Sequence, residues 1–178
     1  MFTFKKVYIV LSFLLALSGC SALNKMAGLP YNEGNGYSIE HDKQIYGGGV
    51  TIEYRDIDFL RTEVTKTMNN RMSSESELEQ ALENLPQGGR ILIHYEAQTI
   101  DAANTKWLEY VLLKDGKEVY RKTGTDSIAN RPVSYSGGIG FWWDIDILDI
   151  NFPFEIPVEL VVVSNLKNKR DTFKISKP

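Results

Sequence analysis

The sequence predicts a mainly β domain: a sandwich of about seven strands with an immunoglobulin-like or related Greek-key topology and one or two short helices. Three observations lead to this prediction. From residue 90 onward, apolar and polar residues alternate with a period of two, which is typical of half-buried strands. The dipeptide Asp115-Gly116 lies between two such runs and is a strong hairpin signal. Residues 74–85, in contrast, have the spacing of an amphipathic helix.

The N-terminal residues have the form of an export signal. Lys5 and Lys6 supply positive charge, and residues 7–17 form an apolar run without a charged side chain. This run is well short of the roughly 20 residues that a membrane-spanning helix needs, and no later apolar run reaches its length. We therefore expect a signal peptide over residues 1–19.

The only cysteine of the chain, Cys20, directly follows this run. It is preceded by Leu17, Ser18 and Gly19, and these four residues resemble the lipobox of bacterial lipoproteins. The resemblance implies cleavage after Gly19 and a diacylglyceryl thioether on Cys20, because only a thiol can accept that group. At about 0.8 kcal/mol per buried CH₂, the two or three acyl chains of such a lipoprotein would hold it on a membrane almost irreversibly.

Cleavage at this point would leave a chain long enough for one domain with a substantial core. The formal net charge of −3 would become more negative with the loss of Lys5 and Lys6, which argues against a nucleic-acid partner. Once Cys20 is acylated, no thiol remains for a disulfide. The resemblance implies a place in the cell envelope. An aspartate directly after the cysteine would favour the inner membrane. This chain has Ser21 there, which favours the outer membrane of a diderm organism, with the protein facing the periplasm or the cell surface.

Residues 20–48 are predicted to be the lipidated N-terminus and a flexible tether, and residues 49–178 the sandwich domain. The tether segment is rich in Gly and Asn and shows no sustained period. It contains His41 between Glu40 and Asp42, and this trio could be a set of metal ligands. A solvated imidazole is the simpler interpretation for a flexible segment, so we predict no metal and no cofactor.

Residues 49–54 form the first predicted strand. The next segment, residues 56–70, fits both a helix, with apolar residues at helical spacing, and a strand, with its many β-branched residues. We expect a helix there. A second helix is predicted from Ser74, whose side chain forms a capping box with Glu77, or from Ser76 with Glu79. Its apolar face should pack on an apolar surface.

The remaining strands follow from alternation and turn signals. Seven strand centres are predicted: Thr51, Ile91, Trp107, Val119, Trp143, Val162 and Phe173. The turn between the last two strands carries Lys167, Lys169 and Arg170, which could touch anionic lipid or peptidoglycan, although a solvated turn is the simpler interpretation.

The segment 133–157 is the best candidate for a binding function. If Trp143, Ile145 and Ile147 face the core, alternation places Trp142, Asp144 and Asp146 outside. An exposed tryptophan beside a Ser-Gly-Gly loop could stack on a sugar or anchor a protein partner. The predicted contact residues are Trp142, Tyr135, Asp144 and Asp146. Two alternatives stay open: both tryptophans pack inside, or Asp144, Asp146 and Asp149 bind calcium rather than stay solvated.

Signatures of catalysis are missing from the sequence. It contains no Gly-x-Ser-x-Gly and no His-Glu-x-x-His, and it has only two histidines. We therefore expect no enzyme, although a Ser-Lys or carboxylate pair stays open. The leading hypothesis is a lipid-anchored, non-catalytic module that binds an envelope protein or assists assembly. The alternative is a lipoprotein that binds a glycan or a small molecule.

Overall fold

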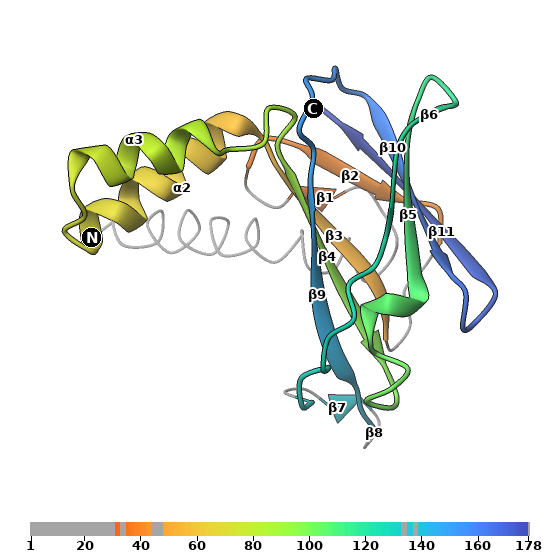
Figure 1. Ribbon diagram of the computed structural model, residues 1–178. Helices are drawn as coiled ribbons and strands as arrows, with labels where there is room; N and C mark the ends of the chain where they lie inside the picture. Colours follow the sequence, from red (N-terminus) through yellow and green to blue (C-terminus); the bar gives the residue numbers. More distant parts are fainter. Residues whose placement is uncertain (1–30, 33–34, 44–47, 133–134, 137–138, 178) are drawn as a thin grey trace, which may run out of the picture.

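Two antiparallel sheets pack face to face and enclose the core between them (Figure 1). The computed structural model describes residues 31–32, 35–43, 48–132, 135–136 and 139–177. The larger sheet has the strand order β1-β2-β11-β10-β5-β6, and the smaller sheet has the order β3-β4-β9. This arrangement confirms the mainly β sandwich that the sequence predicts.

The strands of the larger sheet are β1 (Tyr31–Asn32), β2 (Ser38–His41), β5 (Leu108–Lys114), β6 (Lys117–Thr123), β10 (Val158–Ser164) and β11 (Lys169–Ser176). Those of the smaller sheet are β3 (Gly49–Arg55), β4 (Arg90–Ala97) and β9 (Trp142–Asp149). A separate pair consists of β7 (Tyr135–Ser136) and β8 (Ile139–Gly140). A short 3-10 helix, η1 (Thr105–Trp107), precedes β5. Six of the predicted strand centres lie within strands, and Trp107 lies directly before β5.

The core is built by alternate residues of facing strands. Along β4 every second side chain is buried, among them Ile91, Ile93 and Tyr95. Phe173 and Leu160 of the larger sheet are fully buried and belong to the same apolar cluster. One continuous core therefore joins the two sheets, as the period-two pattern of the sequence predicts.

The short strand β2 lies within the segment that the sequence predicts to be a flexible tether. It pairs with β11 in register from Ser38 opposite Ser176 to His41 opposite Phe173, and its Ile39 is fully buried. A strand that buries an isoleucine in the core is part of the folded domain. The tether prediction for residues 20–48 is therefore wrong over Ser38–His41. Cys20 and the rest of the predicted signal peptide lie outside the described residues.

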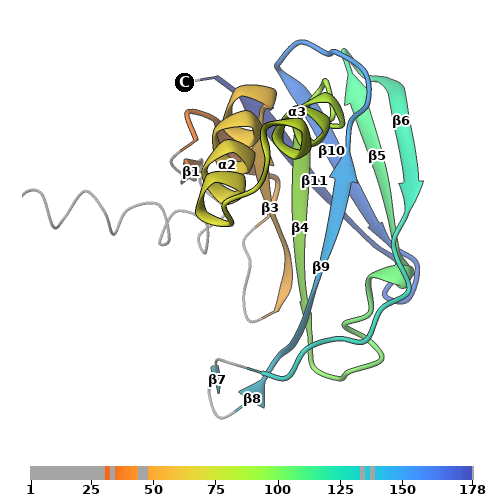
Figure 2. The same cartoon turned by 60° about the vertical axis from the view of Figure 1, so that its left-hand side comes forward.

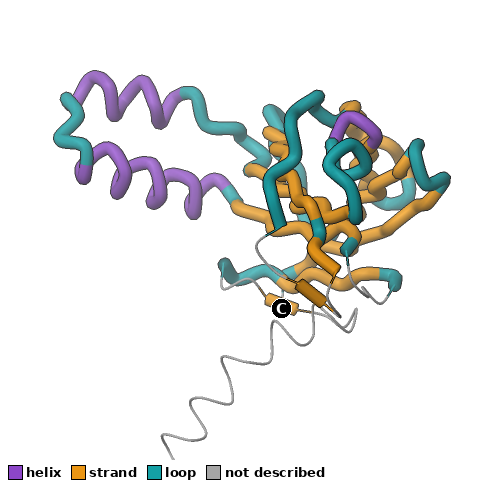
Figure 3. Tube along the Cα trace, turned by 90° about the horizontal axis from the view of Figure 1, so that it is seen from below, coloured by secondary structure: helices purple, strands orange, loops and turns teal. Residues whose placement is uncertain are grey.

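Two helices, α2 (Ile57–Asn70) and α3 (Glu75–Glu83), form a hairpin that projects from the sandwich (Figures 1 and 3). We call this hairpin the helical arm. The side chain of Asp56 accepts a hydrogen bond from the Phe59 N–H at 2.8 Å and starts α2, and the predicted capping box of Ser74 and Glu77 starts α3. Both predicted helices are thus confirmed.

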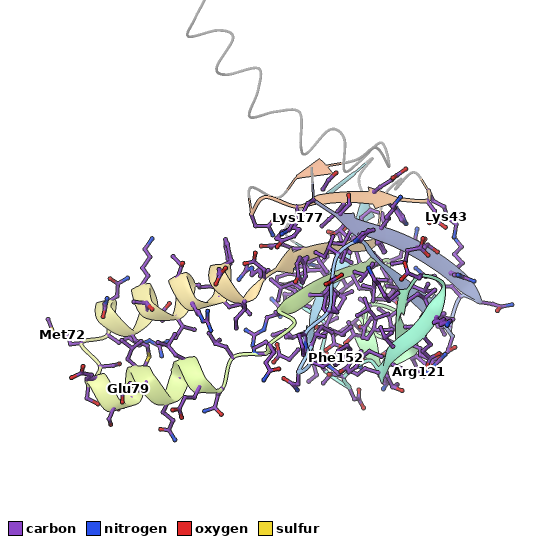
Figure 4. The ribbon with its side chains drawn as sticks, turned by 90° about the horizontal axis from the view of Figure 1, so that it is seen from above. Lys43, Met72, Glu79, Arg121, Phe152 and Lys177 are labelled. Atoms are coloured by element: carbon purple, nitrogen blue, oxygen red, sulfur yellow. The ribbon has the colours of Figure 1, made fainter. Side chains whose placement is uncertain are left out.

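The helical arm has almost no core of its own. Leu60 is the one buried residue of α2, and α3 has none. The two helices pack chiefly on each other rather than on a sheet, so the surface that the second helix packs on is that of α2. At the free end of the arm, Met72 is 94% exposed (Figure 4).

Candidate functional site

The strand β9 faces the opposite way from the sequence prediction. Asp144 and Asp146 are buried, with 5% and 4% of their surface exposed, whereas Ile145 and Ile147 are 48% and 42% exposed. The expectation that Ile145 and Ile147 share the core face with Trp143 is therefore wrong. The inward residues of β9 are Trp142, the two aspartates and Leu148.

Hydrogen bonds explain how a strand can bury Asp146. Its carboxylate accepts from the Thr125 N–H at 2.9 Å and from the Thr125 hydroxyl at 3.0 Å, and Lys122 Nζ lies 3.3 Å away. Burial alone would raise the pKa of Asp146, but these donors and the Ile147 N–H outweigh burial and hold that pKa below its usual value. The negative charge of Asp146 is therefore stabilised inside the protein.

Asp144 has an equivalent set of donors. Its Oδ2 atom accepts from the Thr105 N–H at 3.4 Å, from the Thr105 hydroxyl at 3.3 Å and from the Ser127 hydroxyl. Together the two aspartates fasten η1 and the segment that follows β6 to β9. Satisfied carboxylates of this kind have a structural role, because a buried polar group is stable only when it is hydrogen-bonded.

The predicted contact residues therefore do not form one exposed site. Trp142 is partly buried and packs against the apolar core, and Asp144 and Asp146 point inward. Tyr135 belongs to β7, but its side chain lies outside the part of the chain that the structure describes. The prediction that Asp144 and Asp146 contact a partner at the surface is therefore wrong, because both side chains are buried.

Four apolar side chains lie on the outer face of the smaller sheet, because Ile145 and Ile147 of β9 point outward. Ile147 lies opposite Leu92 of β4, and Ile145 lies opposite His94 in the same register. The ring of Trp143 lies 5.6 Å from the ring of His94, centroid to centroid. We call Leu92, Trp143, Ile145 and Ile147 the apolar strip. Cross-strand neighbours on one face are in contact distance, so these side chains form one continuous surface.

Charged groups border the apolar strip. At one end, Arg90 Nε lies 2.6 Å from Asp149 Oδ1, and Arg55 Nε lies 2.8 Å from Glu53 Oε1 on the neighbouring strand. At the other end Glu96 lies opposite Trp143. An apolar centre with a polar rim is the usual composition of a protein-binding surface.

The helical arm stands over one end of this face (Figure 2). Arg55, on the outer face of β3, connects the two: its guanidinium lies 5.4 Å from the ring centroid of Phe59 and 2.9 Å from Glu63 Oε1, both on α2. Phe59 is itself 37% exposed. The arm and the outer face of the smaller sheet thus form a corner, with the apolar strip on one wall.

The edge of β9 that does not pair with β4 has its backbone N–H groups at Trp143, Ile145 and Ile147 already hydrogen-bonded. The N–H of Ile145 donates to its neighbour Asp144 at 2.9 Å, and the N–H of Ile147 donates to Asp146 at 2.8 Å. The N–H of Trp143 donates to the carbonyl of Asn130 at 3.2 Å. A partner strand would find these donors already used, so this edge is a poor site for strand addition.

A second concave feature, a groove of about 900 Å³, lies where β3 and β4 meet the turn between β10 and β11. Four cationic side chains line it: Lys43, Lys167, Lys169 and Arg170. The partly exposed Phe141 adds aromatic surface, and the ammonium group of Lys167 lies 5.3 Å from the ring centroid of the buried Tyr95. The charge of this groove suits an anionic ligand better than an apolar one.

Comparison with protein-family models, with curated proteins and with solved structures finds no significant match to this chain. Among the described residues, no helix has the length and apolar character that crossing a membrane requires.

Proposed function

We propose that this chain is a lipid-anchored protein of the bacterial cell envelope that acts as a non-catalytic binding module for another envelope protein. The lipobox-like sequence that ends at Cys20 supports the anchor and the envelope location, and Ser21 favours the outer membrane. The observation that carries the binding role is the apolar strip, with Ile145 and Ile147 each more than two-fifths exposed.

The apolar strip is a costly surface to leave in water. Each large aliphatic side chain is worth about 1.5–3 kcal/mol when fully buried, and adjacent exposed apolar residues with a charged rim are typical of an interaction site. Trp143 adds an aromatic ring, the kind of residue that contributes most to protein interfaces. The helical arm would contact the same partner, because Phe59 and Glu63 lie beside Arg55 at the edge of this face.

The test is a pull-down of the full-length chain from detergent-extracted envelope of its native host. Changing Ile145 and Ile147 together to Thr keeps β-branched residues and removes the apolar surface. The matched control is Val119→Thr on β6 of the other sheet, where Val119 is 41% exposed. A protein that co-purifies with the wild type and the control but not with the double variant supports the proposal. Equal co-purification with all three contradicts it.

The groove supports a second candidate function, which is the binding of an anionic glycan. Its cations lie beside Phe141, which is partly exposed, and sugars commonly stack on aromatic rings. Titration with a soluble oligogalacturonate tests this. Replacing Lys169 and Arg170 by Gln should abolish binding, whereas Lys117→Gln in the β6 strand should not. Absence of binding to the wild type would contradict this second candidate.

A further inference from the structure

Three potential metal ligands meet at the end of β2 beside β11. His41 is the last residue of β2 and pairs with Phe173, Asp42 follows it, and Asp171 lies two residues before Phe173 on β11. One ligand atom from each of the three side chains can be chosen so that all lie within 4.8 Å of one another. The sequence separates Asp171 from the other two by most of the domain, and only the pairing of β2 with β11 brings them together.

The burial and hydrogen bonding of the His41 side chain point to a ligand. The residue is only 5% exposed, and neither ring nitrogen makes a hydrogen bond of good geometry among the described residues, although Nε2 faces the carboxylates of Asp42 and Asp171 at ion-pair distance. Sequence alone favours a solvated imidazole here, but the fold removes it from water. A buried polar group without a partner costs about 1–3 kcal/mol, and a metal ion at Nε2 would supply the missing partner.

The distances fit a tetrahedral ion. His41 Nε2 lies 3.4 Å from Asp171 Oδ1 and 3.5 Å from Asp42 Oδ1. Ligand atoms at about 2.0–2.1 Å from zinc, arranged tetrahedrally, are separated from each other by about 3.3–3.4 Å. These two separations match those of adjacent ligands around one zinc-sized ion, and they equally match a His–carboxylate ion pair, so a metal titration decides between the two.

Neighbouring groups hold two of the ligands in place. The ring of Phe173 stacks on the His41 ring with 4.3 Å between centroids and 6° between planes. The N–H of Thr172 donates to Asp42 Oδ1 at 3.0 Å. Such outer contacts fix ligand orientation in metal sites and leave less to be ordered on binding.

We propose that His41, Asp42 and Asp171 bind a divalent transition-metal ion of the zinc class. Three protein ligands leave a fourth position for water or a ligand, the arrangement of open zinc sites. His41 and Asp171 both line the groove, so the proposed site lies at its wall. The proposal is independent of the apolar strip, which lies on the outer face of the smaller sheet.

Lys43 provides an internal test of this site. Its ammonium group lies 3.6 Å from Asp171 Oδ1, and its side chain is 51% exposed. A metal ion would have to displace this cation and would be repelled by it. Removal of the lysine should therefore strengthen metal binding by about two- to fivefold, the range expected for an exposed charge pair.

The experiment is a titration of the full-length chain, purified in detergent without a histidine tag, with Co²⁺ followed by its visible absorption and with Zn²⁺ by calorimetry. One equivalent should bind with the absorption of four-coordinate cobalt. His41→Gln and Asp171→Asn should abolish the bands, and the control His94→Gln, on the outer face of β4, should retain them. Thermal unfolding without metal shows which variants fold.

Three results would overturn the proposal. The first is absence of Co²⁺ and Zn²⁺ binding to the folded wild type, and the second is binding that His41→Gln, once folded, leaves unchanged. The third uses Lys43→Ala, an exposed position where folding is not at risk: affinity equal to or weaker than wild type would show that Asp171 does not ligate the ion. These readouts do not depend on any protein partner.

Discussion

Oδ1 of Asp146 accepts a hydrogen bond at 2.8 Å from the backbone N–H of Ile147, the next residue along β9. The same relationship joins Asp144 to Ile145 at 2.9 Å. In this way each inward carboxylate satisfies a donor on the free edge of its own strand. The arrangement keeps the aspartates inside and the isoleucines outside, and it leaves this edge of the sheet without free donors at Ile145 and Ile147.

Asp146→Asn should lower the free energy of unfolding by about 2–3 kcal/mol at pH 7. Asparagine keeps the shape and one acceptor oxygen, but its NH₂ group replaces the other oxygen and so faces either the Thr125 N–H or the Ile147 N–H without accepting from it; hydrogen bonds to a charged group are worth about 1.5–3 kcal/mol. Urea unfolding of both proteins at pH 7 measures the difference. Equal stability would show that the buried charge is not structural.

The effect of Asp146 should also depend on pH. The pKa of this carboxyl is lowered by folding, so its contribution is present above the unfolded pKa of about 3.9 and is lost as the pH falls through the folded value. The difference between wild type and Asp146→Asn should therefore shrink between pH 5 and pH 2. A difference that stays constant over this range would contradict the assignment.

The two tryptophans should respond differently to truncation. Trp142→Ala should cost about 2–4 kcal/mol, because Trp142 packs against the core, while Trp143→Ala should cost on the order of 1 kcal/mol. The latter loses mainly one hydrogen bond, from Nε1 to the carbonyl of Arg131 at 3.0 Å. Chemical denaturation compares the two variants. A larger loss of stability for Trp143→Ala than for Trp142→Ala would instead support the orientation that the sequence predicts, with Trp143 facing the core.

The strand β2 should be essential to the fold. Ile39→Ala removes a fully buried side chain and should destabilise the domain by about 2–4 kcal/mol. The matched control is the neighbouring Glu40→Ala, an exposed position that should change stability by no more than about 0.5 kcal/mol. If both variants unfold like the wild type, residues 38–41 behave as the tether that the sequence suggests.

Cys20→Ser should abolish lipidation and leave the folding of the domain unchanged. The expectation follows from the lipobox-like sequence, since serine cannot form the thioether. Metabolic labelling with a radioactive fatty acid checks it in the native host, and fractionation follows the protein. Label that persists on the serine variant would rule out Cys20 as the site of attachment.

Most of the strands are readable from the sequence because burial on one face imposes alternation. The hairpin around Asp115-Gly116 is an example, with φ values of 50° and 75° that suit the Asp-Gly pair. The capping box of Ser74 and Glu77 likewise depends only on residues three apart. Local rules are sufficient for features whose interacting groups are close in the chain.

The register of β9 is not readable in the same way. Its alternation is clear, but hydrophobicity alone predicts that Ile145 and Ile147 face the core and that Asp144 and Asp146 face solvent, the reverse of the observed orientation. Side-chain and backbone donors that stabilise Asp144 and Asp146 come from Thr105, Thr125 and Ser127, which lie 17 to 39 positions away in the sequence. The sequence therefore does not predict the apolar strip, although three of its four residues lie in the segment 133–157 that sequence analysis favours.

The metal-ligand cluster and β2 depend on still longer separations. Four residues, Ser38–His41, are too few for a convincing period between segments rich in Gly and Asn. Their partner strand β11 ends the described chain, and the Asp171 that meets His41 belongs to it. No spacing rule connects such positions, because tertiary pairing alone determines which residues meet.

The central claim is that the apolar strip contacts an envelope protein while Cys20 holds the chain on the membrane. Site-specific photocrosslinking in intact cells of the native host tests it most directly, with benzoylphenylalanine at Ile145 or, as the control, at exposed Lys174 on β11. We predict a discrete protein adduct from position 145, none from position 174, and loss of the adduct when Cys20 is also changed to Ser. Adducts from position 174 alone, or from neither position, would contradict the account.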